Sequence, residues 1–279
     1  MAKSVKSAAK KKTSKKAAAP AKRAKTASKK AAKATKATAA RQKAGGNGRP
    51  RATQSRESQD ARRARAARIL KGLRELYPDA DCALHHRSAY ELLTATILSA
   101  QCTDERVNQV TPDFFRRYPN PAALAEGTQE DVEALIKSTG FFRNKTKSLL
   151  GFARKVCDEH GGEIPDEMEA LLELPGVARK TANCVLGTWF EKNEGIVVDT
   201  HVGRLALRMK LLTSARDDKD AVKIERDLME LFPREAWTYL SHALIQHGRR
   251  VCAARKPKCE ECALAANCPS AGKVANGSW

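Results

Sequence analysis

Apolar residues recur at helical spacing through most of the chain, from about residue 60 to residue 250. Strand-like alternation of apolar and polar residues is nearly absent, and proline and glycine fall between the periodic segments. The stretch 195–198 is too short to be more than a connector. The sequence predicts an all-α protein of roughly ten helices. Their expected ranges are about 60–77, 88–98, 104–118, 129–138, 144–160, 167–172, 178–190, 201–210, 219–232 and 236–249.

The N-terminal part of the chain has a different composition. Residues 1–56 hold 19 of the 52 lysines and arginines and no acidic residue, so the rest of the chain carries only +1 of the +20 net charge. Almost nothing in this segment is large and apolar, and we therefore predict that residues 1–58 are a disordered tail. It resembles the tails of linker-histone-like proteins and is predicted to bind DNA phosphates non-specifically. A solubilising extension or a targeting segment is the alternative.

The sequence lacks an apolar leader and any run of eighteen apolar residues. We therefore expect a soluble protein in a reducing compartment, with no membrane association, and we expect it to be a monomer. The expected location is the bacterial cytoplasm in association with the nucleoid, and the eukaryotic nucleus is the alternative.

Four of the eight cysteines fall within seventeen residues, in the pattern C-x6-C-x2-C-x5-C. Four thiolates in so short a segment predict a metal centre rather than disulfides. Zinc and a four-iron cluster both suit these ligands, and the spacing, which is not the ferredoxin run, slightly favours zinc. The loop between the first two cysteines carries three cations that suit phosphate binding. The cysteines are Cys252, Cys259, Cys262 and Cys268, and the cations are Arg255, Lys256 and Lys258.

Residues Leu174–Asn183 predict a tight turn that leads into a helix. Pro175 fixes its own φ, and Gly176 permits a backbone angle that other residues avoid. The amides at such a helix start are suited to binding anions, and Lys180 lies in that first turn, opposite an apolar stripe. The stripe consists of Ala178, Ala182, Val185 and Trp189. Taken alone, the segment is an ordinary turn with a solvated lysine.

Asp199 follows the apolar run 196–198 and stands at the start of a predicted helix. Asp at such a position commonly caps the helix. The alternative is a carboxylate held beside Lys180, and the spacing in the sequence does not decide between the two.

In their order and separation, these motifs resemble the endonuclease III family of helix-hairpin-helix DNA glycosylases. The resemblance covers about Ala61 to Cys268 and rests on five segments. They are Leu174–Asn183, Asp199–His201, the four-cysteine segment, Leu98–Asp104 and His247–Arg249.

The resemblance implies two helical lobes with double-stranded DNA against the cleft between them. A six-helix barrel containing the helix-hairpin-helix would span residues 83–194. Residues 59–82 and 195–268 would form the second lobe, which holds the cysteines, and residues 269–279 a C-terminal tail. The four cysteines match the ligands of a [4Fe-4S] cluster, which reverses the slight preference for zinc.

The resemblance also implies an activity, that of a bifunctional DNA glycosylase and abasic-site lyase that removes oxidised pyrimidines. Lys180 matches the nucleophile and Asp199 the activating carboxylate. The damaged base is flipped out, and an oxidised base that stacks poorly flips more easily. The neutral amine of Lys180, favoured by the helix dipole and by partial burial in the cleft, then attacks C1′. Asp199 accepts a proton and stabilises positive charge on the sugar. The Schiff base allows loss of a proton at C2′ and cleavage on the 3′ side.

Further positions match DNA contacts of the family. The hairpin amides around Gly176, with Ala178 and Arg179, would hold phosphates, and Gln101 would fill the gap left by the flipped base. Phe141 falls in the slot of an intercalating residue, although two core phenylalanines at 141 and 142 are equally consistent with the sequence. Ala178 replaces a second glycine of the hairpin. We expect this position to be helical and to lie on the apolar stripe, so that alanine costs nothing there.

Two other functions compete with this one. A monofunctional glycosylase of the same superfamily lacks an amine at the Lys180 position and needs an acidic residue in the helix before Gln101. Residues Leu92–Thr103 contain neither Asp nor Glu, which disfavours it. A non-catalytic DNA-binding module would not need both Lys180 and Asp199.

Overall fold

The structure, a computed structural model, describes residues 57–274. These residues belong to one compact unit and contain eleven α-helices, three short 3-10 helices and no strand. No helix in this range is long and apolar enough to span a bilayer. The α-helices are α1 (Gln59–Leu76), α2 (Ala89–Leu98), α3 (Asp104–Arg117), α4 (Pro121–Ala125), α5 (Gln129–Ile136), α6 (Phe142–His160), α7 (Met168–Leu172), α8 (Arg179–Thr188), α9 (Thr200–Arg208), α10 (Ala221–Met229) and α11 (Trp237–Arg250). The 3-10 helices are η1 (Lys137–Thr139), η2 (Arg234–Ala236) and η3 (Ala265–Asn267).

The all-α prediction is confirmed, and the predicted helices lie within a few residues of those observed. One helix, α4, was not predicted from the sequence. Its signals were present, because Pro121 occupies the first turn, where its missing N–H costs nothing, and the Asn120 side chain accepts from the Ala123 amide at 2.9 Å. The helix has only five residues, too few to show a helical period.

The folded chain begins slightly earlier than predicted. The disordered tail predicted for residues 1–58 lies outside the described residues apart from its last two. Ser58 accepts from the Ala61 amide and caps α1, while Glu57 pairs with Arg65 at 2.7 Å. At the other end, the described chain continues in turns past residue 268, and Val274 is buried.

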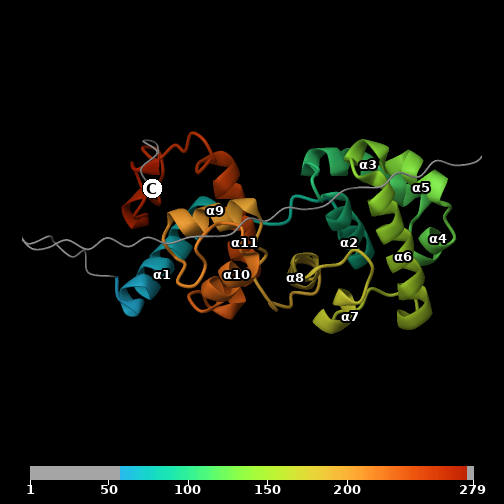
Figure 1. Cartoon of the computed structure of the whole chain (residues 1–279), viewed down its shortest axis with the longest axis horizontal. Helices are drawn as coiled ribbons and strands as arrows, with labels where there is room; N and C mark the ends of the chain where they lie inside the picture. The colour runs from blue at the N-terminus through green and yellow to red at the C-terminus, as the bar shows by residue number, and fades with distance from the viewer. Residues whose placement is uncertain (1–56, 275–279) are drawn as a thin grey trace, which may run out of the picture. The chain divides into compact units, whose positions relative to one another are not determined.

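Apolar side chains gather in two separate clusters. The first is formed mainly by α2 to α8, with Phe114 and Phe152 among its fully buried members. The second is formed by α1 and α9 to α11, and includes Ile69 and Leu240. Figure 1 shows α1 beside α11, which it contacts although the whole first cluster separates them in sequence. We call residues 83–194 the α2–α8 region, and residues 59–82 with 195–268 the α9–α11 region.

The two regions contact each other chiefly through α8 and α11. The helices approach closely at Gly187, where a Cβ atom would collide with the Thr238 side chain. Thr188 on α8 also lies within hydrogen-bond distance of the His242 ring on α11, with Oγ1 and Nε2 3.2 Å apart. These contacts hold the C-terminal end of α8 against the second region.

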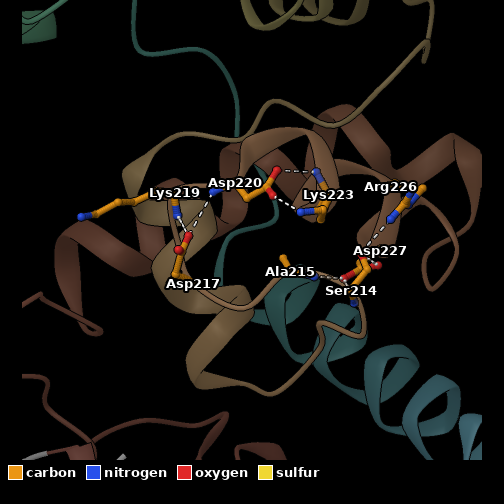
Figure 2. A network of polar contacts seen from close by, with 8 residues as sticks. All are labelled: Ser214, Ala215, Asp217, Lys219, Asp220, Lys223, Arg226 and Asp227. Carbon is orange, nitrogen blue, oxygen red and sulfur yellow. Dashed lines mark hydrogen bonds and ion pairs between the residues drawn. The ribbon is translucent and has the colours of Figure 1, made fainter. Parts of the chain in front are cut away.

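The α9–α11 region depends on a buried carboxylate in addition to its apolar cluster. Asp227 accepts hydrogen bonds from the amides of Thr213, Ser214 and Ala215 and from two hydroxyls, at 2.7–3.2 Å. Figure 2 shows Ser214 and Ala215 directed at Asp227, while Asp217 and Asp220 bond to the chain at the start of α10. Burial alone would raise the pKa of Asp227, but hydrogen bonds from Ser214 and Thr213 outweigh it and lower the pKa to about 2.

Candidate active site

Lys180 and Asp199 line one cavity, of about 250 Å³. Lys180 comes from the α2–α8 region, and Asp199 comes from the α9–α11 region. The sequence motifs alone left open whether the two would meet. Other lining residues come from the segment before α2, the end of α2, α8 and α11. They include Asp81, Cys82, Ser99, Cys184, His242 and Arg249.

The turn before α8 requires glycine at position 176. Gly176 has φ of +83°, and a Cβ atom there would lie 2.5 Å from that of Ser148. The predicted tight turn is therefore confirmed, and it brings the first turn of α8 out to the surface. Any other residue at this position would be strained in its backbone and would collide with α6.

Ala178 is not helical, and this corrects the sequence prediction. It is the N-cap of α8, with an extended backbone (φ −103°, ψ 167°), and it is exposed. The cost of positive φ does not arise, because the backbone angle is an ordinary one. The apolar stripe is also shorter than predicted: Ala182 and Val185 are fully buried, whereas Trp189 is 40% exposed.

Because alanine stands at the N-cap, no side chain caps α8. Within residues 57–274, the first amides of the helix therefore meet no side-chain acceptor and can bind an anion. Lys180 is the second residue of the helix and is exposed, contrary to the expected partial burial. Residues 178–180 are all exposed, and Lys180 nevertheless lines the cavity.

Asp199 caps α9, as the simpler interpretation predicted. Its Oδ1 accepts hydrogen bonds from the amides of His201 and Val202, both at 2.8 Å. These bonds fix the carboxyl group, which is half-buried and lines the cavity. The capping role and a chemical role are therefore compatible, because both amide bonds use one oxygen.

Two ion pairs join the two regions, one of them on the cavity, and neither was predicted from the sequence. Arg249 on α11 contacts Asp104, the first residue of α3, with Nη2 and Oδ2 2.6 Å apart. Arg179, next to Lys180, donates from Nε to both carboxylate oxygens of Glu225 at 2.9 and 3.1 Å. Glu225 also accepts from the Asn183 side chain at 2.8 Å. The predicted DNA contact Arg179 thus has an intramolecular partner, and its role stays a prediction.

Gln101 and Phe141, the two residues expected to probe the base stack, share an unusual backbone conformation. Both have positive φ, 54° and 48°, and both are exposed. Phe141 is 62% exposed, so it does not belong to the core, whereas Phe142 packs against the first cluster. Non-glycine residues in this conformation occur where surrounding structure enforces it and often at functional sites.

A buried lysine that was not predicted from the sequence connects the loops that carry Gln101 and Phe141. Lys145 on α6 is 5% exposed, and its Nζ donates to the carbonyls of Leu98 and Thr139, both at 2.8 Å. Gln101 lies three residues after Leu98 in the chain, and Phe141 lies two residues after Thr139. Burial lowers the pKa of Lys145. A lysine in an apolar helical stripe was the available signal, since such a residue needs buried partners.

The four clustered cysteines line a single pocket near the end of α11. Within residues 57–274, no three His, Cys, Asp or Glu side chains lie close enough together to hold a single metal ion. Four thiols around one pocket are a donor set that suits either a zinc ion or an iron–sulfur cluster. Arg208 donates to the carbonyls of Ala253 and Ala254 at 2.8 and 2.7 Å and so holds the cysteine loop in place. Arg255, Lys256 and Lys258 are all exposed on that loop.

Comparison with known proteins agrees with this geometry. Residues 94–234 match the family described as HhH-GPD superfamily base excision DNA repair protein. The chain is 56% identical to Endonuclease III of Synechocystis over 203 residues, which are 73% of this chain and 91% of that protein.

Two solved structures extend the likeness to the fold. One is a non-covalent Endonuclease III–DNA complex, with a TM-score of 0.72 and 36% identity, covering 77% of this chain and 98% of the other. The second is a trapped Endonuclease III–DNA covalent intermediate, with a TM-score of 0.71 and 36% identity, covering 76% and 98%. The latter protein therefore forms a covalent bond with DNA.

Proposed function

The chain belongs to the endonuclease III family, a family of bifunctional DNA glycosylases and abasic-site lyases of base excision repair, and we propose that Lys180 and Asp199 carry out this chemistry here. The observation that supports the proposal is their position on one cavity, each supplied by a different region. The proposed substrate is double-stranded DNA with an oxidised pyrimidine or an abasic site.

Each residue has a distinct part in the proposed reaction. Lys180 attacks C1′ of the flipped nucleotide and displaces the base, forming a Schiff base. Asp199, held by its two amide hydrogen bonds, accepts a proton and stabilises the positive charge that develops on the sugar. The Schiff base acts as an electron sink, a proton leaves C2′, and the 3′ phosphate is eliminated.

The DNA contacts are proposed from exposure and position. The amides around Gly176 and Ala178 bind a phosphate, helped by Arg179, while Gln101 and Phe141 enter the base stack where the damaged base leaves. The loop cations Arg255, Lys256 and Lys258 bind phosphates further along the duplex.

Borohydride trapping on a duplex with a single abasic site tests the reaction. The Schiff base is reduced to a stable adduct, so wild-type protein should become covalently attached to DNA. Lys180→Ala should give no adduct and should lower the incision rate at least about a thousandfold. An adduct of equal yield in Lys180→Ala would show that another residue is the nucleophile.

The matched control is Lys71→Ala on α1, an exposed lysine that does not line the cavity. It should trap DNA like the wild type. A panel of single-lesion duplexes then separates the candidate functions. Base release without trapping would indicate a monofunctional glycosylase, and binding without either would indicate a DNA-binding module.

The proposed cofactor is a [4Fe-4S] cluster held by Cys252, Cys259, Cys262 and Cys268. Their common pocket and their thiol chemistry support it. The cluster would pin the cation-bearing loop against α9 and α11. Purified protein should contain about four irons per chain, and Cys259→Ser should lower that content. Colourless protein that contains zinc would refute the assignment.

Residues 1–56 are proposed to hold the enzyme on DNA without sequence preference, and the chain is proposed to act as a monomer. The support is the charge of the segment, 19 cations with no acidic residue. Deleting residues 1–56 should flatten the salt dependence of non-specific DNA binding. An unchanged slope would leave this segment without a role on DNA. The bacterial source of the relative favours the nucleoid over the nucleus as its location.

A further inference from the structure

Two cysteines outside the metal-binding segment line the candidate active-site cavity. Cys184 lies on α8, one helical turn after Lys180 and on the same face. Cys82 lies in the segment that joins α1 to α2, next to Asp81, which lines the same cavity. Neither residue is one of the proposed cluster ligands, and the proposed reaction uses neither thiol. The two thiols are therefore nucleophilic side chains in the cavity with no role in the proposed reaction.

Both thiols line the cavity, and they lie within hydrogen-bonding range of each other. Cys184 belongs to the first apolar cluster, and Cys82 packs against that cluster. Thr96 lies on the other side of Cys184, with its Oγ1 3.9 Å from Sγ. A hydrogen bond from Cys82, with further ones from Thr96 and Thr188, lowers the pKa of Cys184, and the same contact raises that of Cys82. A thiolate at Cys184 is thus stabilised with a protonated partner beside it.

We propose that Cys82 and Cys184 form a reversible disulfide in the active-site cavity when the protein meets a peroxide, and that this bond slows DNA incision. The Cys184 thiolate attacks one peroxide oxygen, which gives a sulfenic acid and releases water or an alcohol. Cys82 sulfur then displaces the hydroxyl group as water and forms the S–S bond. Overall two thiols lose two hydrogens, and the peroxide is reduced to water and a second hydroxyl product.

The position of the pair explains why the bond would affect catalysis. The segment that carries Cys82 crosses between the regions, since Tyr77 packs in the second cluster and Leu84 in the first. A disulfide shortens the sulfur contact to about 2.05 Å and so pulls this crossing segment onto α8, one turn from Lys180. A displacement of the nucleophile of the order of 1 Å is enough to lower a rate strongly, and we expect a decrease of about tenfold or more.

The bond can be detected without any assay of activity. Full-length protein as isolated is treated with hydrogen peroxide, its free thiols are alkylated, and it is digested with trypsin without reduction. The expected product links the peptides 75–87 and 181–192, with a mass two hydrogens below their sum. Incision of an abasic-site duplex should fall in step with this product, and dithiothreitol should restore both.

Two variants separate the disulfide from general oxidative damage. Cys82→Ser replaces a half-buried thiol by a near-isostere, and Cys184→Ala removes the buried one. Neither variant should give the linked peptide. After peroxide treatment, Cys184→Ala should incise DNA at the same rate as the untreated Cys184→Ala protein. Damage to a metal cluster would instead inactivate wild type and variants alike.

Absence of the linked peptide in wild-type protein would overturn the proposal. A linked peptide that leaves the incision rate unchanged would overturn it as well. The effect on rate rests on the proposed lyase function, but the linked peptide does not. A chain that forms the peptide and shows no incision even when reduced would count against the proposed function and not against the disulfide.

Discussion

The α2–α8 region and the α9–α11 region supply the two halves of one cavity, and they are stabilised differently. The first is held by a large apolar cluster, and Lys145 is its only buried charge among the described residues. The second buries Arg65, Arg204, Arg208, Glu225 and Asp227 and carries the cysteine pocket. Buried charges must be paired, so polar bonds fix the geometry of the second region more than they do in the first.

This difference separates stability from activity. In the α2–α8 region the proposed functional residues Lys180, Gln101 and Phe141 are exposed on a core that does not need them. In the α9–α11 region Asp199 is both a proposed catalytic group and a helix cap, and the loop cations sit between cysteines. Substitutions in the α9–α11 region are therefore expected to affect stability and activity together, unless the new side chain preserves the structural role.

The largest expected effect is that of Asp199→Asn, which tests whether the two roles can be separated. Asparagine caps helices as well as aspartate does, so the free energy of unfolding should change by less than about 0.5 kcal/mol. It cannot accept the proton, and the base-release rate should fall about a thousandfold. Single-turnover assays and thermal melts measure the two quantities. Equal rates in variant and wild type would leave Asp199 as a cap only.

Asp227→Asn should destabilise the protein by about 2–3 kcal/mol, because the amide cannot accept all the bonds that the carboxylate takes. The folded-state pKa of about 2 lies below the usual aspartate pKa of 3.8, so this stability is fully present above pH 4. It is lost as pH falls from about 4 to about 2. Urea melts across this range should show wild type losing stability that the variant lacks throughout. Parallel pH profiles would contradict this assignment.

Lys145→Met should cost about 2 kcal/mol, because it leaves the Leu98 and Thr139 carbonyls without their buried donor. It should also weaken binding to lesion-containing duplex, since the loops bearing Gln101 and Phe141 lose their common tie. Fluorescence anisotropy with and without a lesion measures this. Lys147→Met, on the exposed face of the same helix, is the control. Loss of stability with unchanged lesion preference would limit Lys145 to a packing role.

The smallest expected effect is that of Phe141→Ala. The side chain is 62% exposed, so the melting temperature should not change measurably. Lesion binding should weaken about fivefold, the loss of about 1 kcal/mol of stacking. Phe142→Leu, a volume-reducing change in a packed residue, should do the reverse and lower stability more than binding. If Phe142→Leu weakened lesion binding and Phe141→Ala lowered stability, the intercalating residue would be Phe142 instead of Phe141.

The sequence by itself determined what depends on near neighbours in the chain. Helical periods, the turn at Gly176 and the cap at Asp199 follow from local backbone preferences, which need no distant partner. The clustered cysteines indicated a metal for the same reason. The helix α4 was too short to show a helical period. Ala178 was predicted to be helical but is the N-cap, because the start of a helix depends on which residue is the last one with an extended backbone.

The tertiary structure alone decided which distant residues meet. The placement of Lys180 and Asp199 on one cavity, the pairing of Arg179 with Glu225, and the bonds from Lys145 to two loops all bring together elements far apart in sequence. Such contacts are set by how the apolar faces of whole helices pack, and no local pattern records that. The exposure of Phe141 and the contact between Cys82 and Cys184 were settled in the same way, because burial is a property of the assembled fold.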